Sequence, residues 1–236
     1  MRVSIPIAAV VLTLLAAACS STSPSATAPS ATAKPSAGAT SSAPVNPNAG
    51  LLTGTQLKPL LAPASWFPRG FTLDPKGSVD TGDYHQPVSP PGPLKCDRLN
   101  GTSWVDLGND GAVSFAQNDY LDPSIGQYAQ EIDVYQGTTA QDVMAQLRKV
   151  VASCRSFHDS QSSSTVTVTM RKGPQLGDDG LTIRLQDPRW GGDVTLEAVR
   201  VGTAVITVYF SSASGTSQPQ ATRLAAVVTA NLKKKS

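Results

Sequence analysis

The stretch Val194-Thr-Leu-Glu-Ala-Val-Arg-Val201-Gly202-Thr203-Ala204-Val-Ile-Thr-Val-Tyr-Phe210 contains two runs rich in β-branched and apolar residues, joined by a Gly-Thr pair. Such runs on either side of a short glycine-containing turn predict a β-hairpin. Upstream, Thr165–Met170 and Leu181–Leu185 alternate apolar and polar residues strictly, as half-buried strands do. Residues 165–210 therefore predict a run of consecutive strands.

Two longer stretches carry the 3.6-residue periodicity of amphipathic helices. In 139–154 one face collects Val143, Leu147, Val150, Val151 and Cys154. In 218–233 the apolar face consists of Leu224, Val227, Val228 and Leu232. Thr138 and Ser217, each with a glutamine three residues further on, have the spacing of a capping box. A short opening helix is expected at 55–61, bent or ended by Pro59.

Earlier parts of the chain predict further strands. Ser103–Leu107 and Ala112–Gln117 flank the turn-forming sequence Gly-Asn-Asp-Gly at 108–111, and Tyr128–Tyr135 precedes the first long helix. We interpret the proline-rich stretch 63–93 as a long irregular segment that can include short strands. Runs of strands punctuated by single helices predict an α+β fold: a single domain with a mainly antiparallel β-sheet packed with two or three helices.

The first fifty residues differ in composition from the rest. Residues 1–18 combine one positive charge, an apolar run and three closing alanines, which predicts a signal peptide. Cys19 follows in a context that resembles the lipobox of bacterial lipoproteins, so we expect it to carry a lipid; plain secretion after cleavage behind Ala18 is the alternative. Residues 20–44 are almost all Ala, Ser, Thr or Pro, so 19–50 is predicted to be the lipidated cysteine and a disordered tether, and 51–236 the folded domain.

Composition and motifs exclude several function classes. The formal charge of +2 is too small for a nucleic-acid-binding surface. The two histidines, His85 and His158, lie too far apart for an HExxH zinc helix, and the sequence has no GxSxG, SxxK, Walker A or GxGxxG motif. We therefore predict no catalytic residue, no metal site and no cofactor.

Cys96 and Cys154 remain once Cys19 is assigned to the lipid. An even number of cysteines in an exported protein favours a disulfide, and Cys154 lies on the apolar face of its predicted helix. The competing interpretation is a catalytic thiol of Cys154 paired with His158, four residues further on.

Two tryptophans are candidate ligand-binding residues. Trp66 lies in the proline-rich stretch, and Trp190 lies in the turn sequence Asp187–Asp193. For each of them, packing against the core is the competing interpretation. A binding role requires that the ring line a cavity.

The order of these features resembles one known family. The segments that carry the likeness are Leu51–Leu57, Cys96, Glu131–Tyr135, Val150–Cys154, Arg200–Val205 and Leu224–Val228. In this order they resemble the extracellular sensor domain of the actinobacterial serine/threonine kinase PknH and its stand-alone lipoprotein relatives. The resemblance implies a twisted antiparallel sheet with packed helices and a cleft for an extracellular ligand. It also implies four cysteines in two disulfides, of which this chain retains only Cys96 and Cys154.

The resemblance and the predicted lipid anchor together suggest a function. We expect a non-catalytic, sensor-like or ligand-binding lipoprotein, held by its lipid at the extracytoplasmic face of the cell membrane. Its partners would be that membrane and an unknown extracellular ligand or envelope protein, with no nucleic acid. The alternatives are an envelope protein-interaction or structural lipoprotein without a small-molecule site, and an unrecognised hydrolase built around one of the histidines.

Overall fold

The computed structural model describes residues 46–90, 92–108, 111–124 and 126–235, which belong to one compact unit. The predicted signal peptide, Cys19 and most of the predicted tether lie outside the described residues. Within the described part of the chain, no helix is both long enough and apolar enough to cross a membrane.

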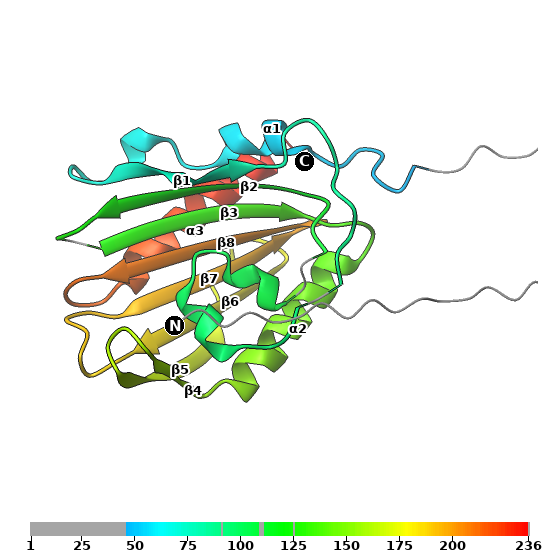
Figure 1. The fold of residues 1–236 in the computed structure, drawn as a ribbon. Helices are drawn as coiled ribbons and strands as arrows, with labels where there is room; N and C mark the ends of the chain where they lie inside the picture. Colours follow the sequence, from blue (N-terminus) through cyan, green and yellow to red (C-terminus); the bar gives the residue numbers. More distant parts are fainter. Residues whose placement is uncertain (1–45, 91, 109–110, 125, 236) are drawn as a thin grey trace, which may run out of the picture. The chain divides into compact units, whose positions relative to one another are not determined.

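One eight-stranded sheet forms the centre of this unit (Figure 1). Its strands are β1 (Thr72–Asp80), β2 (Ser114–Asp122), β3 (Gly126–Val134), β4 (Ser156–Asp159), β5 (Ser164–Lys172), β6 (Asp179–Gln186), β7 (Val194–Val201) and β8 (Ala204–Ser212). They lie in the order β1-β2-β3-β8-β7-β6-β5-β4, and every neighbouring pair is antiparallel. The prediction of an α+β fold with a mainly antiparallel sheet is confirmed.

Helical segments cover both faces of the sheet. On the face that we call the α2 face lie α2 (Thr139–Ser153) and the 3₁₀ turns η3 (Cys96–Asn100) and η4 (Trp104–Leu107). On the opposite α3 face lie α3 (Gln218–Lys233), α1 (Gly54–Leu57), η1 (Lys58–Leu60) and η2 (Ala64–Trp66). In Figure 1, η3 and η4 pass in front of the strands and α3 lies behind them. Each face has its own apolar core, so side chains of both orientations on the inner strands are buried.

The locally encoded elements are found where the sequence predicts them. The hairpin of β7 and β8 turns through Gly202, whose φ of 57° is in the left-handed region that glycine favours. α2 and α3 match the predicted ranges, and the opening helix changes to a 3₁₀ turn that contains Pro59. The predicted capping boxes are wrong: neither Thr138 nor Ser217 bonds its own helix through its hydroxyl.

Two predictions about the first half of the sheet are corrected. Ser103–Leu107 is not a strand, because Trp104–Leu107 forms η4, which buries Trp104 and Val105 against the α2 face. The proline-rich stretch holds a full edge strand, β1, with Pro75 at the point where its register against β2 shifts. An edge strand with a bulge tolerates proline, because no neighbour needs the missing N–H there.

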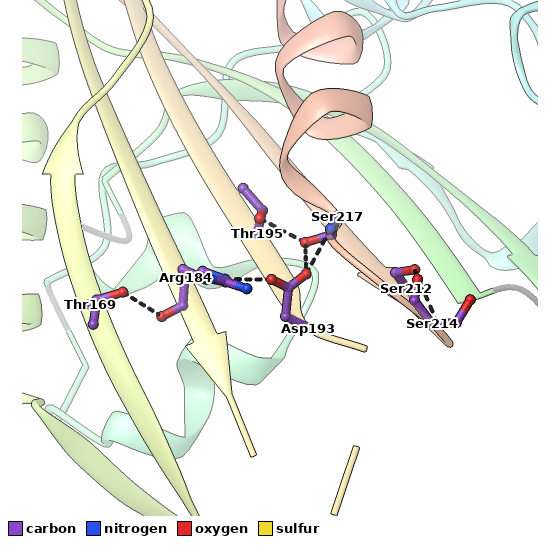
Figure 2. A network of polar contacts seen from close by, with 7 residues as sticks. All are labelled: Thr169, Arg184, Asp193, Thr195, Ser212, Ser214 and Ser217. Carbon is purple, nitrogen blue, oxygen red and sulfur yellow. Dashed lines mark hydrogen bonds and ion pairs between the residues drawn. The ribbon is translucent and has the colours of Figure 1, made fainter. Parts of the chain in front are cut away.

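Ser217, the first residue before α3, is bound by a buried polar network on the α3 face (Figure 2). Asp193 Oδ1 accepts hydrogen bonds from Ser217 N, at 2.7 Å, and from Ser217 Oγ, at 2.6 Å. The same hydroxyl lies 2.7 Å from Thr195 Oγ1, and Arg184 Nε pairs with the other carboxylate oxygen of Asp193. Burial raises the pKa of Asp193, but these contacts outweigh burial and leave the pKa below its usual range. The ionised carboxylate therefore fixes the start of α3 against β7.

Candidate ligand-binding pocket

A cavity of about 200 Å³ opens on the α2 face, between η4 and strands β2 and β3. We call it the acidic pocket. Its lining residues are Val79, Gln86, Ser103, Asp106, Ala112, Phe115, Gln117, Glu131 and Asp133. Among the residues that the structure describes, this lining includes three carboxylic acids and no lysine, arginine or histidine.

Two buried carboxyl groups form the floor of the acidic pocket. Glu131 and Asp133 are two residues apart on β3 and so point to the same face of the sheet. They are only 4% and 3% exposed. Glu131 Oε2 and Asp133 Oδ2 are each buried without a hydrogen-bond partner among the described residues. A buried carboxyl oxygen without a partner is costly to a fold, so this pair marks a candidate functional site.

The polar groups around the pair bond mainly to one another. Gln117 lies directly across from Glu131 on β2, but its amide donates to Asp119 Oδ1, at 2.8 Å, and to Thr102 Oγ1, at 3.1 Å. Gln117 Oε1 accepts a hydrogen bond from Ser103 Oγ at 3.0 Å. Asp106 is paired with Arg98 at 2.9 Å. Within the described residues, the surrounding network thus holds the walls of the pocket in place and leaves one oxygen of each floor carboxyl unpaired.

Burial dominates the electrostatics of the floor. It raises the pKa of Glu131 well above its usual range, and the negative charges of Asp133, Asp106 and Asp119 raise it further. Burial likewise raises the pKa of Asp133 well above its usual range, with Asp106 adding to the effect. Burial also raises the pKa of Asp119, partly offset by its hydrogen bonds to Gln117 and Thr102. The two floor carboxyls therefore hold their protons more firmly than exposed acids do.

These raised pKa values predict an unusual pH dependence of stability. Well below about pH 4, the folded and unfolded chains both carry protonated groups at these positions, so the raised pKa values lower stability by nothing there. As the pH rises, the unfolded chain gives up these protons first, so the free energy of unfolding falls until the folded-state pKa values are passed. In Glu131→Gln/Asp133→Asn this loss is absent, so the variant gains stability over the wild type as the pH rises. Urea denaturation between about pH 4.5 and pH 8 measures this difference.

The control for this experiment carries the same change in charge on the surface. Asp83→Asn/Asp97→Asn removes two exposed carboxyls and leaves the pocket intact. Comparison with this control separates the contribution of Glu131 and Asp133 to the pH dependence of stability from that of the other carboxyls. Asp193 is one of these, and its lowered pKa makes stability fall on acidification. If the pocket variant and the wild type kept a constant difference across the pH range, the floor carboxyls would not be protonated in the native state.

The disulfide predicted from the sequence joins Cys96 and Cys154, with their Cα atoms 5.4 Å apart. It ties η3 to the residue that follows α2, so the segment carrying η3 and η4 is fixed over the sheet. Because Cys154 is oxidised and His158 lies exposed on β4, the competing thiol–imidazole pair is not formed. Nε2 of His85 is buried without a hydrogen-bond partner among the described residues.

The structure does not bring the two candidate tryptophans together. Trp190 packs partly buried on the α2 face, beside a cavity of about 360 Å³ lined also by Asn100, Asp159 and Tyr209. Burial raises the pKa of Tyr209 to about 12, so its hydroxyl stays neutral and lies 3.2 Å from Asn100 Oδ1. Trp66 packs on the α3 face and lines a groove of about 590 Å³. Each ring is thus both partly packed and next to a cavity.

The two larger cavities lack the buried polar atoms without a hydrogen-bond partner that line the acidic pocket, as far as the described residues show. Trp66 packs edge-on against Phe67 and Tyr128. Its groove is lined mainly by apolar residues of 59–66, together with Val227 of α3 and the polar residues Asn231, Lys234 and Lys235. No side-chain atom lining either larger cavity is among the buried unpartnered polar atoms of the described residues. The acidic pocket is therefore the strongest candidate for a site that binds a polar ligand.

Glu131 and Asp133 were not candidates in the sequence, although both lie inside the predicted strand 128–135. Acidic residues that alternate with Tyr128, Ile132 and Val134 indicate a solvent-facing side of a one-sided sheet. That side is covered by η4, which the sequence predicted as a strand. The available signal was the position of two carboxylates in the middle of a strand whose other residues, apart from Gln130, are apolar.

Comparisons with known proteins support the fold. No family model matches the chain, and no curated protein is similar to it in sequence. The fold is similar to that of one solved extracellular domain. The crystal structure of the extracellular domain of PknH from Mycobacterium tuberculosis superposes with a TM-score of 0.52 and 13% identity, over 78% of this chain and 97% of that chain. The likeness confirms the fold that the sequence resemblance implied.

Proposed function

We propose that this protein is an exported, sensor-like lipoprotein that binds an extracellular ligand in the acidic pocket and does not catalyse a reaction. The observation that carries the proposal is a pair of buried carboxyl oxygens on the floor of a cavity, those of Glu131 and Asp133, which have no hydrogen-bond partner in the described part of the chain. Groups that cost folding energy and line a cavity indicate a binding site, because a ligand can supply the missing partners. The sensor-domain fold agrees with this role.

The proposal places the domain outside the cell, on a lipid carried by Cys19. The supporting features are the signal-like residues 1–18, the lipobox-like context of Cys19 and the Ala/Ser/Thr/Pro tether that follows. The Cys96–Cys154 disulfide agrees with an oxidising compartment. Mass spectrometry of the mature N-terminus tests the anchor: a diacylated Cys19 is expected, and an unmodified Cys19 or a cut elsewhere contradicts it.

Ligand binding can be tested with a variant that fills the pocket. Ser103 lines the acidic pocket and Ser65 lines the Trp66 groove, so Ser103→Phe and Ser65→Phe place the same ring in two different cavities. We expect soluble fragments of digested cell envelope to shift the NMR signals of pocket residues in the wild type and in Ser65→Phe. Ser103→Phe, with an unchanged circular dichroism spectrum, should lose these shifts. Shifts confined to the Trp66 or Trp190 cavity, or binding retained by Ser103→Phe, would contradict the proposal.

One observation favours the alternative, a protein-interaction lipoprotein of the envelope. Five of the seven exposed large apolar side chains of the described residues lie between 73 and 94, on β1 and the segment after it. β1 is also an edge strand, and edge strands can pair with a partner. If Leu73→Lys/Val88→Lys abolished an envelope complex and Ser103→Phe did not, the interaction role would replace the ligand-binding one.

A further inference from the structure

The acidic pocket has a chemical character that selects among ligand classes. Both floor carboxyls are more than nine-tenths buried, and each has an oxygen without a partner among the described residues. The third acid of the lining, Asp106, already has Arg98 beside it, and none of the lining residues that the structure describes is basic. We propose that the acidic pocket binds the ammonium or guanidinium group of an organic cation between Glu131 and Asp133. This inference rests on the proposed ligand-binding function and adds the class of ligand.

The donor and acceptor balance of the site favours a cation over other ligands. An ionised carboxylate only accepts hydrogen bonds, whereas an ammonium group offers three N–H donors and a guanidinium group offers five. Glu131 and Asp133 are about 7 Å apart along β3, close enough for one multi-donor group to serve both side chains. Charge-assisted N–H···O bonds of this kind are the strong ones in a buried site. An anion would instead meet three carboxyl groups at close range.

Size and ligand count separate an organic cation from a metal ion. Calcium takes six to eight oxygen ligands and magnesium takes six. The described residues contain no group of three or more His, Cys, Asp or Glu side chains placed to hold a metal ion. A volume of about 200 Å³ equals roughly seven water molecules, which suits a charged head group with a short alkyl stem. Val79, Ala112 and Phe115 supply apolar wall for such a stem.

Binding of a cation would be coupled to release of protons. In the free protein, burial and mutual repulsion favour the protonated forms of Glu131 and Asp133. A cation placed between them favours the ionised forms, so a proton leaves a carboxyl for the buffer as the ammonium group takes its place. The charged groups that face the pair are Asp106 from η4, whose partner is Arg98, and Asp119 from β2. A neutral ligand would bind without this release.

Three of the probes for the experiment share a four-carbon chain and differ in charge, and two further probes extend the comparison. n-Butylammonium and methylguanidinium are the cations, butan-1-ol is the neutral analogue, butyrate is the anion, and calcium chloride tests the metal ion. Each is titrated into the full protein while NMR signals of the pocket residues are followed. We expect both cations to shift those signals and the other three probes to leave them unchanged. Calorimetry in two buffers of different ionisation enthalpy is expected to show proton release with the cations.

Variants separate the site from the general charge of the protein. Glu131→Gln/Asp133→Asn is expected to weaken binding of the cations by roughly tenfold or more and to abolish proton release. The surface control Asp83→Asn/Asp97→Asn should bind as the wild type does. Stronger binding of butan-1-ol, of butyrate or of calcium than of the two cations would overturn the inference, as would equal cation binding by the pocket variant.

The outcome also distinguishes this inference from the proposed function. If neutral or anionic envelope fragments shift the pocket signals while neither cation does, the pocket binds a ligand of another class and only the inference fails. If no probe and no envelope fragment shifts these signals, the proposed function fails as well.

Discussion

Replacing Cys96 and Cys154 by alanine is expected to lower the free energy of unfolding by roughly 4 kcal/mol and the melting temperature by roughly 8–16 °C. The two cysteines are 58 residues apart, so the bond removes much of the freedom of a long loop from the unfolded chain. Urea denaturation and thermal unfolding followed by circular dichroism measure the loss.

The disulfide experiment needs a background without the third thiol. Cys19→Ser alone is the control and should unfold as the wild type does. Reducing the disulfide of the Cys19→Ser protein should reproduce most of the loss. Reduction breaks the bond but keeps the buried Cys154 side chain, so it measures the effect of the bond without the cavity that alanine would leave. A change below about 1 kcal/mol in both experiments would mean that the bond does not constrain the unfolded chain. The cover formed by η3 and η4 should loosen in parallel, as faster hydrogen exchange at Leu99 and Trp104.

Tyr128→Ala is expected to cost about 3–5 kcal/mol of stability. The Tyr128 ring is 1% exposed on the α3 face and stacks on Phe210, with ring centroids 4.0 Å apart. Phe71, Phe67 and Trp66 meet it edge-on at 4.9, 5.4 and 5.8 Å. Truncation to alanine removes the central ring of this group and leaves a cavity that its rigid neighbours cannot fill. Chemical denaturation measures the loss.

An exposed tyrosine provides the matched control. Tyr84 is 65% exposed, so Tyr84→Ala should change the free energy of unfolding by less than about 0.5 kcal/mol. Because Tyr128 faces α3 and the acidic pocket lies on the α2 face, Tyr128→Ala should still bind a pocket ligand under conditions in which it is folded. A Tyr128→Ala variant as stable as Tyr84→Ala would show that the aromatic group repacks.

The prediction of Ser103–Leu107 as a strand shows where sequence patterns fail. A short run of Ser, Trp, Val, Asp and Leu before a turn-forming sequence suits a strand as well as a 3₁₀ turn. The structure selects the turn because Trp104 and Val105 bury themselves against a sheet face that is built from distant strands. β1 was missed for a related reason, since its proline is tolerated only through its place at the sheet edge.

The predictions made for the cysteines and for the tryptophans had different outcomes. The Cys96–Cys154 bond followed from cysteine number, export signals and the helical face of Cys154, all of which are visible in the sequence, and it is confirmed. The two tryptophans were selected for their residue type and for their places in a proline-rich stretch and a turn sequence, and the structure places them on opposite faces of the sheet. Their binding role stays a prediction, as does the lipid on Cys19.

The sequence by itself determined the elements whose pattern is local: the β7–β8 hairpin, the alternating strands β5 and β6, and the two amphipathic helices. Their backbone hydrogen bonds join residues that are close in the chain, so periodicity of 2 or 3.6 residues is sufficient evidence. Only the tertiary structure decided that the sheet is covered on both faces and that η4 lies over β2 and β3. That covering buries Glu131 and Asp133. Their burial could not be predicted from the sequence, because the burial of a strand's second face depends on which distant segment packs there.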